Sequence, residues 1–298
     1  MTTVLERTAA APISWGVCEV PGWGIQLPVE RVLREMSEVG LRATELGSVG
    51  YLPTNPAELT RTLRSFGLDL TGGFNSLALA DANRRDDTLR QVHQSAQLLA
   101  DAGATDYVTC VVSDPHNWTR PELTEAHWSC IFSMLDEVGT TVAGYGLTQM
   151  LHPHVDSLIE TAAEVQRVLD NSEVRWVLDT GHLLIGGYDP VEFAGKYAER
   201  VSLVHLKDLR SDIAARLNAE SLTLMLAVQA GLFVPLGQGD ASIAAVVQTM
   251  EAQGYERWYV IEQDVAITTG EPPEGEGPIR DVQRSVAFIR SLETESGS

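Results

Sequence analysis

Imidazole and carboxylate groups recur near the ends of four apolar segments in the second half of the chain. These segments are GLTQMLHPH, VRWVLDTGH, VSLVHLKD and WYVIEQD. Left unpaired, such groups would be costly to bury, whereas a divalent cation bonds to them directly. Mixed imidazole and carboxylate ligation suits Mn²⁺ or Co²⁺, which we expect, with Zn²⁺, Fe²⁺ or Mg²⁺ as alternatives. The predicted ligands are Asp179, His205 and Glu262, with His152 or His154 as the fourth.

Alternation within each segment predicts which polar groups face the same way. Side chains along a strand point to opposite faces with period two. The groups that share a side are Met150 with His152 and His154, Leu203 with His205 and Lys207, Val260 with Glu262 and Asp264, and Ala43 with Glu45. Asp179 ends its own segment, and His182 follows in the turn. We therefore expect these side chains to converge at one end of a barrel.

Eight short apolar runs alternate with longer amphipathic stretches along the whole chain. The predicted strands are residues 11–17, 41–47, 68–75, 107–112, 146–154, 174–179, 201–207 and 258–264. The spacing of apolar residues predicts helices over residues 28–39, 56–66, 87–102, 121–143 and 158–169. Eight such units favour an α/β fold, a closed (β/α)8 TIM barrel formed by residues 1–298 as a single domain. A doubly wound open sheet is the alternative, but the first turn lacks its G-x-G-x-x-G fingerprint.

Two segments interrupt this alternation. An extra helical segment of about residues 211–231 follows the seventh predicted strand, and a loop of about residues 265–278, rich in Gly, Pro and Glu, follows the eighth. Both would lie at the carboxyl ends of the strands, where barrel enzymes keep their active sites. Long loops in that position are typical of lids or substrate walls, although the second loop fits surface decoration equally well.

The charge balance and the cysteine count narrow the class of protein. The 298 residues include 41 Asp and Glu against 21 Lys and Arg, which gives a formal charge of −20. Such a surface disfavours a nucleic-acid partner, because phosphate backbones are bound by clustered Lys and Arg. The three cysteines cannot all pair, and the first residues contain no apolar run of the length expected for a signal peptide. No segment approaches the ~20 apolar residues that span a membrane. We therefore expect a cytoplasmic protein with no membrane partner, for which a homo-oligomer is one option.

The chain also has a family resemblance. It resembles the xylose-isomerase-like barrels in the order and spacing of LHPHVDSLIET, VLDTGHLLIGGYDP, VHLKDLR and VIEQD. With the N-terminal run APISWGVCEVPGWG, these motifs are similar to those of the inosose dehydratase branch of the sugar isomerase/epimerase group. Epimerase members hold their metal with Glu on strand five, Asp on strand six, His on strand seven and Glu on strand eight. The resemblance thus implies Asp179, His205 and Glu262 as ligands, while His152 stands nearest the place of the absent strand-five Glu.

The resemblance implies a metal-dependent lyase that dehydrates 2-keto-myo-inositol (inosose), or a related small keto-polyol. A chelated metal polarises the ketone and stabilises the enediolate, and a general acid assists departure of the β-hydroxyl. Glu262 is the expected ligand and base, and a proton for the leaving hydroxyl is expected from His152, His154 or Lys207. The predicted substrate contacts are Trp15, Glu45, Asn75, His182 and Lys207.

Three other functions fit the same barrel. The first is a sugar isomerase, a ketose 3-epimerase or a β-eliminase acting on a 3-keto sugar, although symmetric epimerisation would need the missing strand-five carboxylate. The second is an abasic-site endonuclease, which the charge of −20 disfavours. The third is a sugar-binding or regulatory barrel without turnover, which the intact set of Asp179, His205 and Glu262 disfavours.

Overall fold

Parallel strands form the centre of the protein in a computed structural model that describes residues 2–219 and 221–295. Nine strands pair in the order β3-β2-β1-β11-β8-β7-β6-β5-β4. Their bounds are β1 Thr8–Ala10, β2 Ala43–Thr44, β3 Asp69–Leu70, β4 Gly72–Leu77, β5 Asp106–Val111, β6 Thr148–Leu151, β7 Arg175–Asp179, β8 Val201–Leu206 and β11 Tyr259–Ile261. A separate antiparallel pair consists of β9 (Asp208–Leu209) and β10 (Phe233–Val234).

The nine-stranded sheet closes where β3 and β4 meet. These two strands are parts of one extended run that only Thr71 separates. Thr71 N–H donates to Thr44 O at 2.9 Å and Leu46 N–H donates to Gly72 O at 2.9 Å, while β4 pairs with β5 along its other side. The run therefore joins both edges of the sheet. The prediction of an α/β TIM barrel is confirmed.

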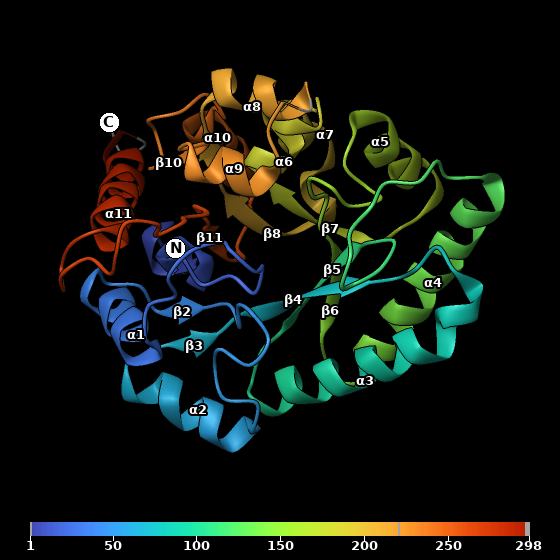
Figure 1. Ribbon diagram of the computed structural model, residues 1–298, viewed down its shortest axis with the longest axis horizontal. Coiled ribbons are helices and arrows are strands. Elements are labelled where there is room, and N and C mark those ends of the chain that lie inside the picture. The colour runs from blue at the N-terminus through green and yellow to red at the C-terminus, as the bar shows by residue number, and fades with distance from the viewer. Residues whose placement is uncertain (1, 220, 296–298) are drawn as a thin grey trace.

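Helices surround these strands (Figure 1). They are α1 Val29–Glu38, α2 Pro56–Ser65, α3 Arg85–Asp101, α4 Glu125–Ala143, α5 Ala162–Asn171, α6 Thr180–Ile185, α7 Pro190–Tyr197, α8 Ser211–Asn218, α9 Leu224–Gln229, α10 Ile243–Ala252 and α11 Pro278–Glu295. Both α4 and α5 begin later than predicted, because Thr124 and Thr161 form capping boxes that set their first turns. None of the helices in the described part of the chain is long and apolar enough to cross a membrane.

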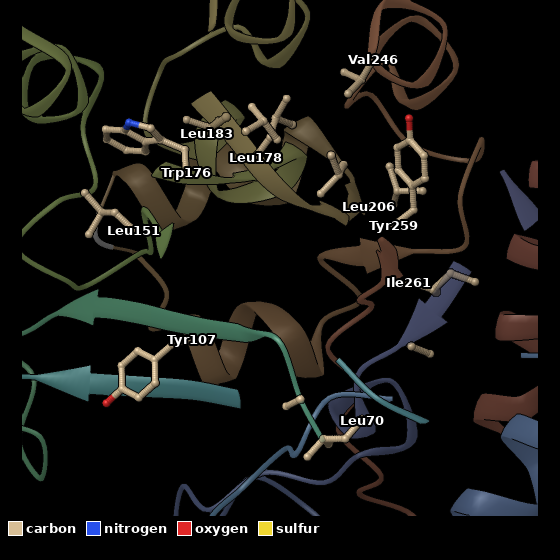
Figure 2. Close-up of a cluster of buried hydrophobic side chains, with 14 of the residues drawn as sticks. Leu70, Tyr107, Leu151, Trp176, Leu178, Leu183, Leu206, Val246, Tyr259 and Ile261 are labelled. Carbon is tan, nitrogen blue, oxygen red and sulfur yellow. The ribbon is translucent and has the colours of Figure 1, made fainter. Parts of the chain in front are cut away.

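Two hydrophobic layers hold the barrel together. The outer layer lies between strands and helices, where Figure 2 shows Trp176 and Leu178 of β7 near Leu183 of α6. The inner layer fills the barrel with Ala9, Ala11, Ala43, Val108, Met150, Val177, Leu203 and Val260. Each large apolar side chain that is fully buried contributes about 1.5–3 kcal/mol. These two layers thus hold the strands in place as far as their carboxyl ends, where polar side chains follow the apolar ones.

The first predicted strand is wrong. The chain leaves the sheet after β1 and forms a short 3-10 helix, η2 (Pro12–Trp15), where residues 11–17 were predicted to be extended. Pro12 at the first position has no N–H to donate to a neighbouring strand, and its φ is already suited to a helical turn. The predicted strands over residues 41–47, 146–154 and 258–264 extend beyond the ends of β2, β6 and β11.

Both interrupting segments are packed onto the barrel. The helices α8 and α9, seen together in orange in Figure 1, share a hydrophobic cluster with Trp23, Val155 and Phe233. The loop after β11 is tied to α1 by the buried Arg31, which donates to Pro272 O at 2.6 Å and to Pro273 O at 2.8 Å. Both segments are therefore held by specific contacts with the rest of the fold.

Candidate metal centre

The four residues that form the centre continue the inward-facing rows of the barrel. Apolar residues of the inner layer lie two positions before each of them, namely Met150 before His152, Val177 before Asp179, Leu203 before His205 and Val260 before Glu262. Because side chains alternate with period two, the four polar groups form the next layer toward the carboxyl ends. The structure thus brings together side chains from the ends of β6, β7, β8 and β11.

One ligand atom from each of the four residues lies within 4.8 Å of the other three. His152 Nε2 is 3.2 Å from His205 Nδ1 and 3.4 Å from Asp179 Oδ2. Glu262 Oε2 is in direct contact with His205 Nδ1. The side chain of Glu262 is 14% exposed and the other three are at most 2% exposed, so the cluster is almost dry. Of the two histidines that follow β6, His152 belongs to this cluster and His154 does not.

Two carboxylate oxygens in this cluster fit a cation. Asp179 Oδ2 and Glu262 Oε2 are buried and make no regular hydrogen bond, and their close polar contacts are with the imidazole nitrogens of His152 and His205. The other oxygen of Asp179 is used elsewhere, since Oδ1 accepts the N–H of His182 at 2.7 Å and caps α6. Buried acceptors without a donor are costly, and a divalent ion would satisfy both of them beside two imidazole nitrogens. The donor set therefore fits a divalent metal, whose identity it leaves open between several first-row ions.

Electrostatics keep both carboxylates ionised. Burial opposes the charge of Glu262, but Lys207 and His205 outweigh it and hold the pKa of Glu262 below its usual value. Burial likewise opposes the charge of Asp179, and His182 and Lys207 lower the pKa of that carboxyl well below its usual range. Both residues thus present the anionic form that binds a metal.

The structure places Glu45 against His205, a candidate metal ligand. Glu45 Oε1 lies 3.2 Å from His205 Nε2, on the ring edge opposite the nitrogen that faces Asp179 and Glu262. A carboxylate bonded to the far nitrogen fixes the orientation of a metal-binding histidine and raises its basicity. Glu45 was predicted to contact the substrate. The geometry gives it a role in holding His205, and the substrate contact remains a prediction.

We expect Glu45→Gln to weaken metal binding by about 10–100-fold, the range for partners of metal-bound histidines. The amide keeps the size of the side chain but removes the charge beside His205. The measurement is a competition titration of Mn²⁺ against a chelator. Asp106→Asn is the matched control, because it neutralises a buried carboxylate at the opposite, amino end of the barrel. Equal affinity of Glu45→Gln and wild type would contradict this role.

Lys207 forms a second charged group beside the four ligands. Its Nζ donates to Asp264 Oδ1 at 2.7 Å and lies 3.3 Å from both Glu262 Oε1 and His182 Nε2. Burial opposes the charge, but Asp264 and Glu262 outweigh it and raise the pKa of Lys207. Burial in turn raises the pKa of Asp264 to about 6. An ammonium group thus sits next to one oxygen of a candidate ligand.

His154 lies in an aromatic wall next to the cluster. Its ring centroid is 3.9 Å from that of His182, 5.2 Å from that of Trp118 and 5.8 Å from that of Phe74. Burial, with His152 and Lys207 nearby, lowers the pKa of His154 to about 3. His154 is partly exposed, unlike the deeply buried His152 and His182. His154 therefore lies between the cluster and the solvent.

Two other predicted substrate contacts have mainly structural partners. Trp15 is fully buried in the outer hydrophobic layer, and its indole N–H donates to Glu35 of α1 at 2.8 Å. Asn75 lies within β4, not at its end, and donates to Gly73 O at 2.8 Å and Val108 O at 3.3 Å. Packing thus accounts for Trp15, and a substrate contact of either residue stays a prediction.

The sequence pattern assigned no role to two residues that surround Lys207. Asp264 lies two positions after Glu262 and therefore points to the same side of the segment. The alternation along the segment could thus have indicated that Asp264 lies near the site. Phe233 lies with its ring centroid 4.9 Å from Lys207 Nζ and 6.3 Å from the ring centroid of His182. No local signal indicates Phe233, because its position depends on the return of the chain after α8 and α9.

Comparison with known proteins agrees with this architecture. A family model described as xylose isomerase-like TIM barrel matches residues 33–292. An inosose dehydratase of Geobacillus kaustophilus (strain HTA426) is 30% identical over 275 residues, 88% of this chain and 89% of that protein. The rhizopine catabolism protein MocC of Rhizobium meliloti is 30% identical over 267 residues, 87% of this chain and 81% of that protein. The solved structure of the IOLI protein with a binding zinc atom has a TM-score of 0.71 and 13% identity, with 97% of this chain and 98% of that chain covered. At that identity the likeness concerns the fold alone.

Proposed function

Because this chain belongs to the xylose isomerase-like TIM barrel family, we propose that it is a metal-dependent hydro-lyase acting on 2-keto-myo-inositol or a closely related keto-polyol. The observation that carries this proposal is the asymmetry of the cluster. Histidines 152 and 154 follow β6 on one side, and a single glutamate, Glu262, follows β11 on the other. Elimination needs one base and a different acid, whereas symmetric epimerisation needs two equivalent bases. The similarity to proteins named inosose dehydratase supports the same substrate class.

Four residues would hold the divalent ion, namely His152, Asp179, His205 and Glu262. The bound ion would polarise the ketone and stabilise the negative charge that develops on its oxygen. Mn²⁺ or Co²⁺ is the ion we propose. The IOLI protein, which has the same fold, binds a zinc atom, so Zn²⁺ is the nearest alternative.

Glu262 is the proposed base. Its carboxylate takes the proton from the carbon next to the ketone, and the bond electrons move toward the carbonyl oxygen. The 3.3 Å contact of Oε1 with Lys207 Nζ keeps this carboxylate ionised and fixes its orientation. The hydroxyl on the β-carbon then departs as water with a proton from a second group, so the reaction is a net loss of one water. The candidates for that proton are Lys207, His152 and His154, which lie beside Glu262, His205 and His182 respectively. Lys207 is charged, whereas the lowered pKa of His154 leaves its imidazole neutral near pH 7.

The remaining polar groups would position the substrate. His182 and Lys207 face each other at 3.3 Å beside Glu262, and both can donate to the hydroxyls of a polyol. Asn75, whose amide donates to backbone carbonyls within the sheet, is a further predicted contact for a hydroxyl. The partly exposed rings of Phe74 and Trp118 would form an apolar wall on one side of the proposed substrate site. A compact, hydroxyl-rich ring is the type of substrate that suits this mixture.

A substrate panel tests the proposal. The metal-loaded protein is incubated with a set of keto-inositols and ketoses, and dione absorbance and epimer formation by NMR are followed in parallel. We expect a dione from 2-keto-myo-inositol and no epimer from the ketoses. Formation of a ketose epimer without dione from any keto-inositol would favour the isomerase or 3-epimerase and would overturn the lyase.

Replacement of His154 should separate two steps of the reaction. If His154 assists departure of the hydroxyl, His154→Ala should slow elimination by about 10²–10⁴-fold and leave exchange of the α-proton much less affected. The measurement is deuterium wash-in against dione formation in D₂O. His93→Ala, a histidine on the outer helix α3, is the control and should change neither rate. If His154→Ala keeps the wild-type ratio of the two rates, the proton comes from another group.

A further inference from the structure

We infer that Ser14 is a positioning residue, which fixes Glu262 for metal binding by holding the backbone on both sides of it. The Ser14 hydroxyl donates to the carbonyl of Ile261 at 3.2 Å and accepts the N–H of Gln263 at 3.0 Å. These are the residues immediately before and after Glu262. Ser14 is fully buried, so water does not compete for either hydrogen bond. The inference rests on the proposed function, because that function makes Glu262 a ligand.

The Ser14 hydroxyl replaces a backbone hydrogen bond between the chain after β1 and the chain after β11 that is missing next to Glu262. Ala10 is the last residue of β1 to pair with β11, opposite Ile261, and Ala11 N–H still donates to Ile261 O at 3.1 Å. In a continuing parallel ladder, the next bond would run from Gln263 N–H to the carbonyl of Ala11. That carbonyl instead accepts the N–H of Ser14 at 3.0 Å, because the chain turns into η2. The Ser14 side chain supplies the acceptor that the turn has removed.

The position of Ser14 is itself fixed from the helix layer. Trp15 is fully buried, and its indole N–H donates to Glu35 Oε2 at 2.8 Å. The other oxygen of Glu35 accepts from Arg31 Nε at 2.8 Å, and Arg31 is nearly buried as well. This chain of contacts anchors η2 to α1. The Ser14 hydroxyl is therefore held rigidly against the end of β11.

The effect on metal binding follows from where Glu262 stands. On the β8 side, its own N–H donates to Leu206 O at 3.1 Å. On the β1 side, the Ser14 hydroxyl takes the place of a strand carbonyl as the acceptor for Gln263 N–H. Loss of that bond would let the backbone after Glu262 rotate, and its Oε2 must meet three ligands from other strands. Small displacements of a ligand are costly when the geometry of the site is preset.

The test is the metal affinity of Ser14→Ala. We expect Mn²⁺ or Co²⁺ to bind about 10-fold more weakly, at the lower end of the range for groups that orient ligands. Hydrogen exchange at the amide of Gln263 should also become faster. The matched control is Ser285→Ala, a fully buried serine on α11 whose hydroxyl accepts Leu236 N–H at 3.1 Å. It removes the same type of bond and should leave metal affinity unchanged. Should Ser14→Ala fail to fold, Ser14→Cys offers a weaker partner of similar size and should weaken binding in the same direction.

A second background separates the possible outcomes. In a Glu262→Gln protein, Ser14→Ala should cause little further loss of metal affinity, because its effect acts through Glu262. Wild-type affinity in Ser14→Ala, or an equal loss in both backgrounds, would overturn the inference and leave the proposed function intact. Absence of metal binding in the wild type would overturn the proposed function and this inference with it.

Discussion

Removal of metal with EDTA should abolish turnover of 2-keto-myo-inositol, and Mn²⁺ or Co²⁺ should restore it. The physical reason lies in the two carboxylate oxygens, Asp179 Oδ2 and Glu262 Oε2, which are buried and make no regular hydrogen bond. In the absence of a cation, the carbonyl of the substrate would have no partner for the charge that develops on it. The measurement is dione formation before chelation, after exhaustive dialysis and after addition of each ion.

Thermal unfolding gives a second readout that does not depend on the substrate. An ion that binds only the folded protein stabilises it by about 2.7 kcal/mol when its concentration is 100 times its dissociation constant. The melting temperature should therefore rise with Mn²⁺, and the rise should be smaller for Asp179→Asn. Full activity in exhaustively demetallated protein would end the account of a metal-dependent enzyme.

Glu262→Gln should lose turnover by at least about 10²–10⁴-fold, the typical contribution of one proton-transfer group. It should also bind metal more weakly, because a neutral amide is a poorer ligand for a divalent ion. Two separate losses are expected because Glu262 faces both His205 and Lys207, through Oε2 and Oε1 respectively. The measurements are steady-state kinetics at saturating Mn²⁺ and a metal titration.

Glu192→Gln is the control for this substitution, since Glu192 pairs with Lys196 on the exposed side of α7. It should affect neither quantity. Glu262→Asp keeps the charge but shortens the side chain, so it should retain more metal affinity than the amide. Turnover of Glu262→Gln near the wild-type level, once the site is saturated with metal, would show that another group removes the proton.

The rows of alternating residues explain why so much of the site was predictable. Asp179, His205 and Glu262 each follow a buried apolar residue by two positions, and the period continues across the end of the strand. Strands with this pattern bring their ends together in a closed barrel or a similar parallel sheet. The convergence of the ligands could therefore be predicted from local pattern.

The parts that the sequence did not reveal depend on contacts between distant segments. Residues 11–17 have the apolar composition of a strand, but Pro12 and the burial of Trp15 against Glu35 make them a turn. Glu45 has the right parity for a substrate contact, yet His205 from another strand lies against it. Phe233 reaches Lys207 only after the chain has returned from α9. Such long-range partners cannot be inferred from spacing along one segment.

In the proposed reaction, a keto-polyol loses water and Glu262 acts as the base. The most direct test is incubation of the metal-loaded wild type with 2-keto-myo-inositol in D₂O, with substrate, dione and deuterium content followed together by NMR. We expect one dione to form for each substrate consumed, and dione formation to be lost in Glu262→Gln. Exchange or epimerisation of the substrate without loss of water would contradict this proposal.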